Sequence, residues 1–151
     1  MSGQRTTPLF VDTGAFFAYF VENSPRHERA RTVMDAIRAG NLRFRPIHTT
    51  GYVLSELTTL ILRKKNHEKA VDTLNRIRES PVVTVVHPDE SQFKSICDEF
   101  ERFDDQQISF VDHTTGALAS EFDAEHVFTF NGDFRTLGFL LMPDDINLSE
   151  D

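Results

Sequence analysis

The chain has little or none of several residue types that define other classes of protein. Its 151 residues include one cysteine, no tryptophan, seven glycines and six prolines. A single cysteine, Cys97, excludes an intramolecular disulfide and is consistent with a reducing environment. Because Cys97 shares helical spacing with Phe93, Ile96 and Phe100, we expect it to be a small buried hydrophobic residue.

Long apolar runs are also missing. No segment approaches the roughly 20 apolar residues that a membrane-spanning helix needs. Residues 1–7 contain one arginine and no apolar core, which argues against a signal peptide. The six histidines are scattered and do not have the spacing of a zinc site. These absences predict a cytoplasmic protein with no membrane association and no structural zinc.

Basic residues are scarce in the second half of the chain. The formal net charge is −8, yet residues 1–79 contain 13 Lys and Arg against 8 Asp and Glu, whereas residues 80–151 contain 3 against 16. An acidic total argues against general nucleic-acid binding, but the basic half could hold a phosphate chain. A charged surface that only confers solubility is the alternative interpretation.

Apolar content of 39% with 14 phenylalanines supports one domain with a substantial core. Short apolar runs predict strands at 8–11, 42–47, 82–86, 126–130 and 139–142, separated by helical patterns. This alternation predicts an α/β fold around a mainly parallel sheet, with 82–86 buried on both faces. Helices at 51–64 and 66–80 should form an antiparallel hairpin. We expect residues 1–143 to form a single domain and the acidic residues 144–151 a loose tail.

Four acids interrupt otherwise apolar surroundings: Asp12, Glu56, Asp112 and Asp133. Asp12 and Asp133 each follow a predicted strand, and ligands of parallel sheets collect outside the carboxyl ends of the strands. Each acid also has a local explanation. Asp12 and Asp133 could cap helices, Asp112 could share a capping box with Ser109, and Glu56 could pair with a nearby cation or face water.

Convergence of the four acids would require a cation, because carboxylates a few ångströms apart repel one another. Ligand sets made only of oxygen select Mg²⁺ or Mn²⁺ over zinc. One or two such ions would polarise a phosphodiester and activate water for its hydrolysis. The hydroxyl groups of Thr13 and Ser109 could orient the ligands or the water.

The ordered set of acids resembles the PIN-domain ribonucleases, and especially the VapC-type toxins of bacterial and archaeal toxin–antitoxin pairs. The resemblance rests on segments 10–13, 53–57, 109–112 and 129–134 and covers nearly the whole chain. It implies a three-layer α/β/α sandwich and cleavage of single-stranded RNA that depends on Mg²⁺ or Mn²⁺. The catalytic metal ligands would be Asp12, Glu56, Asp112 and Asp133.

The same resemblance implies a cognate antitoxin, held by the helical hairpin 51–80, and a homodimer. Two positions depart from the pattern. Asn131 stands where many family members place the last acid, so Asn131 could share the role of Asp133. His113 follows Asp112 where a small residue is commoner, which could alter substrate access.

Candidate contacts to the RNA backbone are the basic residues Arg45, Arg63, Lys64 and Lys65. Asp104 or Asp105 could be an accessory acid, although a solvated loop charge is the favoured interpretation. Two other functions stay open. One is a PIN-like module that binds RNA or protein without cutting, motivated by Asn131. The other is a phosphatase with Asp12 as covalent nucleophile, disfavoured because position 14 is glycine where a second Asp is usual.

Overall fold

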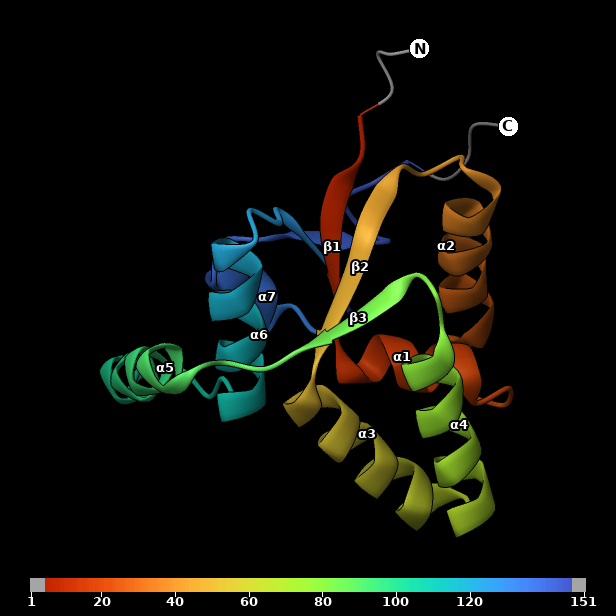
Figure 1. Cartoon of the computed structure of the whole chain (residues 1–151), viewed down its shortest axis with the longest axis horizontal. Helices are drawn as coiled ribbons and strands as arrows, with labels where there is room; N and C mark the ends of the chain where they lie inside the picture. Colours follow the sequence, from red (N-terminus) through yellow and green to blue (C-terminus); the bar gives the residue numbers. More distant parts are fainter. Residues whose placement is uncertain (1–4, 148–151) are drawn as a thin grey trace.

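The computed structural model describes residues 5–147, and in this part of the chain a parallel sheet lies between two layers of helices (Figure 1). In chain order the elements are β1 (Thr7–Val11), α1 (Thr13–Phe20), α2 (His27–Ala39), β2 (Phe44–Thr50), α3 (Gly51–Lys64), α4 (His67–Glu79), β3 (Val83–Val86), α5 (Glu90–Arg102), α6 (Phe110–Glu121), β4 (His126–Phe128), α7 (Asp133–Thr136) and β5 (Leu140–Met142). The predicted α/β/α architecture is confirmed.

The sheet has the strand order β3-β2-β1-β4-β5, and every neighbouring pair is parallel. β1 is therefore central, and the chain winds outward from it in both directions. All carboxyl ends of the strands meet at one edge, which is the lower edge in Figure 1, where α1 and α3 begin. The residues that follow the strands consequently gather at this edge.

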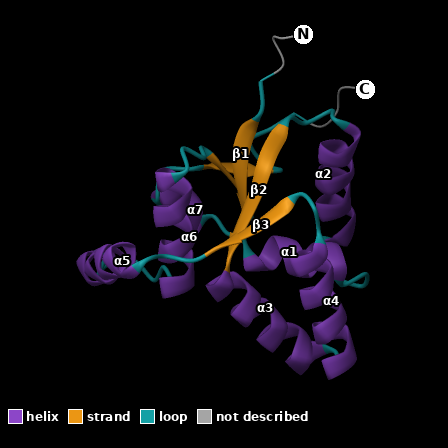
Figure 2. Cartoon of the chain, viewed as in Figure 1, coloured by secondary structure: helices purple, strands orange, loops and turns teal. Residues whose placement is uncertain are grey.

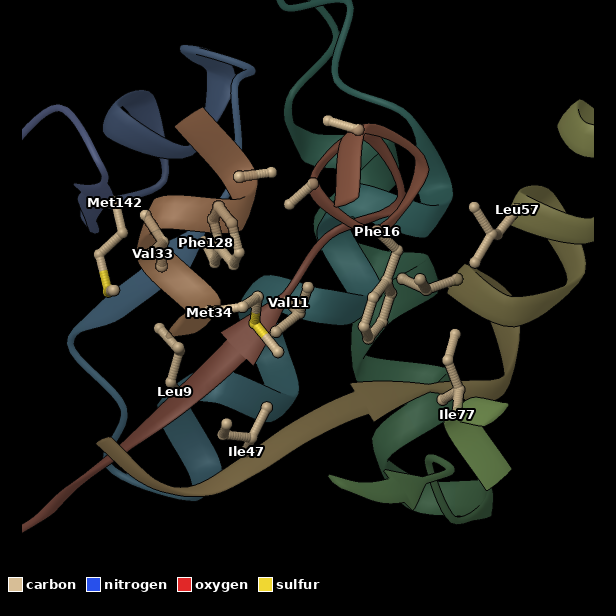
Figure 3. Packing of buried hydrophobic residues seen from close by; sticks show 14 of the residues in the cluster. Leu9, Val11, Phe16, Val33, Met34, Ile47, Leu57, Ile77, Phe128 and Met142 are labelled. Atoms are coloured by element: carbon tan, nitrogen blue, oxygen red, sulfur yellow. The ribbon is translucent and has the colours of Figure 1, made fainter. Parts of the chain in front are cut away.

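Strand alternation divides the core into two parts. In β1, Leu9 and Val11 point into the larger cluster, whereas Phe10 between them points into the smaller one. The larger cluster packs against helices α1 to α4, and Figure 3 shows its side chains around β1. The smaller cluster packs against α6 and α7. Each fully buried side chain of this kind contributes about 1.5–3 kcal/mol, so both faces of the sheet are anchored.

The hairpin of α3 and α4 forms as predicted and extends away from the carboxyl edge of the sheet (Figure 2). The Thr50 hydroxyl caps α3 by accepting from the Val53 N–H at 3.1 Å. The Asn66 side chain caps α4 by accepting from the Lys69 N–H at 2.8 Å. These caps satisfy backbone donors that have no partner within a helix.

Two predictions of burial are wrong. β3 lies at the edge of the sheet, so its residues are half-buried or exposed instead of enclosed on both faces. Cys97 on α5 is exposed, and Phe93 and Phe100 are 41% and 46% exposed. α5 lies outside the sheet and packs on α6, so Ile96 is its only buried residue among those described. Helical spacing identifies an apolar face, but not whether another element covers it.

The extent of β2 also differs from the predicted strand at 42–47. β2 runs to Thr50 and lies inside the sheet although it contains Pro46. The pairing with β1 is irregular between Phe44 and Ile47, and a bulge is where a strand tolerates a residue without an N–H donor.

The first residues of the predicted loose tail are attached to the domain. Asp144 pairs with Arg29 at 2.8 Å, and Asp145 pairs with Arg135 at 2.7 Å and accepts from the Leu141 N–H. Ile146 packs against the larger core cluster. The rest of that prediction, residues 148–151, lies outside the described part of the chain. No helix in the described part is long and apolar enough to span a membrane.

Candidate active site: an acidic cleft at the carboxyl edge of the sheet

A cleft opens where β1 and β4 end and α3 and α6 begin. All four acids predicted from the sequence line it. Its volume is about 650 Å³, which is in the range of sites for nucleotide-sized ligands. The other lining residues are Thr13, Gly14, Thr59, Leu60, Arg63, Gln107, Ser109 and Asn131.

Asp12 lies at the floor of the cleft and is only 5% exposed. It directly follows β1 and is the N-cap of α1, where one carboxylate oxygen accepts from the Thr13 N–H at 2.7 Å. Its other oxygen accepts from the Thr129 hydroxyl at 2.8 Å. The helix-cap interpretation is therefore correct, but it does not remove Asp12 from the cleft.

Glu56 stands on the α3 wall of the cleft. It accepts from the Thr13 hydroxyl at 2.6 Å, which links α3 to the start of α1. Within the described residues Glu56 forms no ion pair with Arg63 or Lys64, contrary to one of the local explanations. The carboxylate is thus directed to the cleft and towards Asp12.

Asp112 belongs to the first turn of α6 and is 7% exposed. The Ser109 hydroxyl caps this helix by accepting from the Asp112 N–H at 3.1 Å, as its spacing predicts. The Asp112 carboxylate instead accepts from the Asn131 side-chain amide at 3.1 Å. The backbone N–H of Asp112 therefore takes part in the helix cap while its carboxylate lines the cleft.

The loop after β4 connects three of the acids. The Asn131 N–H donates to the Thr129 hydroxyl at 2.9 Å, and that hydroxyl donates in turn to Asp12. The Asn131 side-chain oxygen accepts from the Asp133 N–H at 2.9 Å. Asp133 itself makes no side-chain cap for α7, whose N-cap is Gly132. This loop holds Asp12, Asp112 and Asp133 in one constellation.

The electrostatics of the cleft disfavour negative charge. Burial raises the pKa of Asp12 to about 6, with a smaller contribution from Glu56, against the lowering effect of the hydrogen bonds from Thr129 and Thr13. Burial also raises the pKa of Asp112 to about 7, and the charges of Asp12, Glu56 and Asp133 raise it further. A cation placed among these groups would reverse both shifts.

The chemistry of the side chains suits a hard divalent cation, because the donors are carboxylate, hydroxyl and amide oxygens. Within residues 5–147, however, no group of three or more His, Cys, Asp or Glu side chains already stands in an arrangement that would hold a metal ion. The carboxylates are hydrogen-bonded to Thr13, Thr129 and Asn131 instead. The four carboxylates line one cleft, and their charges raise the pKa of Asp112, so they lie near one another. To coordinate one metal ion together, their side chains would have to reorient.

The four basic residues proposed from the sequence lie in different places. Arg63 lines the acidic cleft, one helical turn beyond Thr59. Lys64 and Lys65 are at the end of α3, at the tip of the hairpin. Arg45 lines a separate apolar groove. Asp104 and Asp105 are exposed in the loop before α6, and neither lines the cleft, whereas Gln107 and Ser109 from the same segment do.

Thr129 is the functional residue that the sequence reasoning missed. It is fully buried and bridges Asp12 to Asn131. The available signal was its position as the first polar residue after the apolar strand β4, which pairs with β1, the strand that Asp12 follows. A single polar residue at a strand end is too common for that signal to stand out.

The protein is thus an α/β/α sandwich with a parallel sheet, and four carboxylates line a cleft at the carboxyl edge of that sheet. This class of site offers only oxygen atoms as metal ligands. The family model for the PIN domain matches residues 9–140. The chain therefore belongs to the PIN-domain family, as its motifs predicted.

Individual relatives agree with this assignment. The chain is 30% identical over 134 residues to the 23S rRNA-specific endonuclease VapC20 of Mycobacterium tuberculosis, covering 87% of this chain and 95% of that protein. The crystal structure of M. tuberculosis VapC20, a Sarcin-Ricin loop cleaving toxin, superposes with a TM-score of 0.76, covering 87% of this chain and 96% of that one. VapBC2 from Rickettsia felis shares the fold at 15% identity, with a TM-score of 0.65, covering 89% of this chain and 97% of that one.

Proposed function

We propose that this protein is an endoribonuclease that hydrolyses phosphodiester bonds of single-stranded RNA with Mg²⁺ or Mn²⁺, as the toxin of a type II toxin–antitoxin pair. The observation that carries the proposal is the convergence of Asp12, Glu56, Asp112 and Asp133 in one cleft of a PIN domain. The similarity to an RNA endonuclease over nearly the whole chain supports it.

In this proposal Asp12 and Asp112 hold the metal ion, and Asp133 completes the site. The ion, when bound, polarises the phosphodiester and stabilises charge on the leaving oxygen. Glu56 orients the attacking water and accepts its proton, a role for which its position on the exposed wall is suited. Thr13, Thr129 and Asn131 orient the carboxylates, and Arg63 contacts a phosphate of the strand.

The proposal is tested by RNA cleavage in Mg²⁺ or Mn²⁺ with the parent protein and three variants. Asp12→Asn and Asp112→Asn should lose most of the activity, and Glu56→Gln should lower kcat by roughly 10²–10⁴-fold. Asp72→Asn is the matched control, since it removes an exposed carboxylate of α4 outside the cleft. Parent-like cleavage by both Asp12→Asn and Asp112→Asn would refute the site assignment.

The same assay distinguishes the alternative of a non-catalytic module. Asn131 motivates that alternative. An acid at position 131 would add a metal ligand, whereas the Asn131 amide donates a hydrogen bond to Asp112. A parent protein that binds Mn²⁺ with Asp12 and Asp112, yet cleaves no single-stranded RNA, would favour a binding module over the enzyme.

An antitoxin partner is the second part of the proposal, and an apolar groove supports it. The groove has a volume of about 380 Å³ and lies between α1, α2, α4 and the edge of the sheet near β3. Phe20, Met34 and Ile77 are among its apolar residues, and Arg38, Arg45 and Arg76 lie at its margin. This surface suits an amphipathic, acidic segment of a protein partner. The hairpin expected to hold the antitoxin contributes α4 to the groove.

A further inference from the structure

Arg26 lies over the ring of Phe130, which belongs to the loop that follows β4. Its guanidinium lies 5.2 Å from the centre of the Phe130 ring, and that of Arg29 lies 5.6 Å from the same ring. Phe130 is half-buried and packs against the larger core cluster, so it is a fixed support for the charge above it. A guanidinium stacked on an aromatic ring loses less freedom when its N–H groups bind a ligand.

Phe130 connects this position to the catalytic constellation. It lies between Thr129, which donates to Asp12, and Asn131, which donates to Asp112. Asn131 and Asp133 form one wall of the cleft, and Glu56 and Arg63 on α3 form another. Arg26 therefore lies over the loop whose residues Asn131 and Asp133 line the cleft, and Arg63 lines the cleft from the α3 side.

The two arginines on Phe130 differ in their available charge. Arg29 forms an ion pair with Asp144 at 2.8 Å, so a ligand would compete with Asp144 for its guanidinium. Arg26 is exposed, and in the described part of the chain it forms no ion pair with an acid. Arg63 is the only cation that lines the cleft itself among the described residues, against four acids. An RNA strand that crosses the cleft would therefore meet free positive charge at Arg63 and, beyond the loop, at Arg26.

We propose that Arg26, stacked on Phe130, binds a backbone phosphate of the RNA strand that flanks the cleaved position on the loop side of the cleft. This inference rests on the proposed ribonuclease function and assigns a substrate contact to a residue outside the acidic motifs. The guanidinium of Arg26 is exposed, and an exposed guanidinium can form two parallel hydrogen bonds with phosphate oxygens. Arg26 would position the strand and would not take part in the chemical step.

The test is steady-state cleavage of a single-stranded RNA oligonucleotide in Mg²⁺ or Mn²⁺ at several KCl concentrations. Arg26→Ala should raise KM by about 3–10-fold and leave kcat within about 2-fold. It should also reduce the slope of log kcat/KM against log KCl by about 0.7, the value for one phosphate contact to a single strand. Arg26→Lys keeps the charge but loses the planar fork, so its KM should be intermediate.

Arg31→Ala is the matched control, because Arg31 lies on α2, which begins directly after Arg26, and is paired with Glu28 and Asp35. Its KM and salt slope should equal those of the parent. If Arg26→Ala lowers the melting temperature but keeps the parent KM and salt slope, Arg26 is only a structural support and the inference is wrong. A parent protein that cleaves no RNA would instead refute the proposed function and, with it, this inference.

Discussion

Two buried carboxyl groups, Asp12 and Asp112, dominate the chemistry of the cleft at the scale of single residues. Each accepts hydrogen bonds from neutral groups, and among the described residues neither forms an ion pair with Lys or Arg. Their raised pKa values mean that folding without a metal favours the protonated forms. Keeping Asp12 and Asp112 ionised therefore lowers the stability of the metal-free protein.

Asp112→Asn should stabilise the metal-free protein at pH 8. The substitution removes a charge that is repelled by Asp12, Glu56 and Asp133, while an amide oxygen can still accept from Asn131. We expect a gain of about 1–2 kcal/mol, or roughly 2–8 °C in melting temperature for a domain of this size. Thermal unfolding in excess chelator measures it, with Asp72→Asn as control. A lowered melting temperature would contradict a repulsive cluster.

The stability gain from Asp112→Asn should depend on pH. The pKa of Asp112 is raised to about 7, so the native state of the parent binds a proton that the unfolded chain releases. The parent penalty is therefore greatest above pH 7 and diminishes as the pH falls towards 5.5. Burial lowers the pKa of His48, so this residue makes stability increase with pH. His48 is present in both the parent and Asp112→Asn, so its contribution cancels in the difference between them. A gain that stays constant from pH 8 to 5.5 would contradict the raised pKa.

At the scale of elements, α5 carries an apolar surface that the described chain leaves open. Phe93 and Phe100 make edge contacts with Phe110 at centroid distances of 5.7 Å, yet both remain more than two-fifths exposed. α5 packs on α6 at the outside of the sandwich (Figure 2). Exposed aromatic residues that adjoin one another are typical of protein contacts.

We expect the predicted homodimer to depend on this face of α5. Replacing Phe93 and Phe100 together by serine should raise the dimer dissociation constant by at least about 10-fold, as expected for loss of aromatic anchors. Sedimentation velocity of parent and variant measures the effect. Leu140→Ser is the control, since Leu140 is 46% exposed on β5. A parent that is monomeric, or a double variant that dimerises like the parent, would contradict the prediction.

At the scale of the whole molecule, the acidic cleft and the apolar groove are separate surfaces with different lining residues. They share α1, whose first turn enters the cleft and whose Tyr19 and Phe20 enter the groove. Arg38 and Arg76 lie over these two rings, with guanidinium-to-centroid distances of 5.7 and 5.3 Å, and Arg38 also donates to the Tyr19 hydroxyl at 2.6 Å. A partner in the groove could therefore act on the protein without touching the acids.

Arg76→Glu should weaken binding of the antitoxin, which we expect to be encoded by a small neighbouring gene. Reversing one charge at the margin of the groove should reduce affinity about 10-fold or more while RNA cleavage stays close to the parent value. Arg78→Glu is the matched control, because Arg78 lies on the same helix outside the groove. Co-purification and calorimetry measure the effect, and equal affinities for the two variants would exclude the groove as the binding surface.

Local patterns in the chain predicted most of the helices and strands, and they picked out the four acids that line the cleft. Helix caps such as Asn66, and the alternation of side chains between the two faces of β1, depend on residues a few positions apart. They can therefore be predicted from the sequence alone. The acids Asp12 and Asp112 were identified by their apolar neighbours. The exposure of Cys97, the edge position of β3, the bridge through Thr129 and the place of Arg26 over Phe130 could not be predicted in this way. Each of these depends on which distant elements become neighbours, and only the folded arrangement of sheet and helices specifies that.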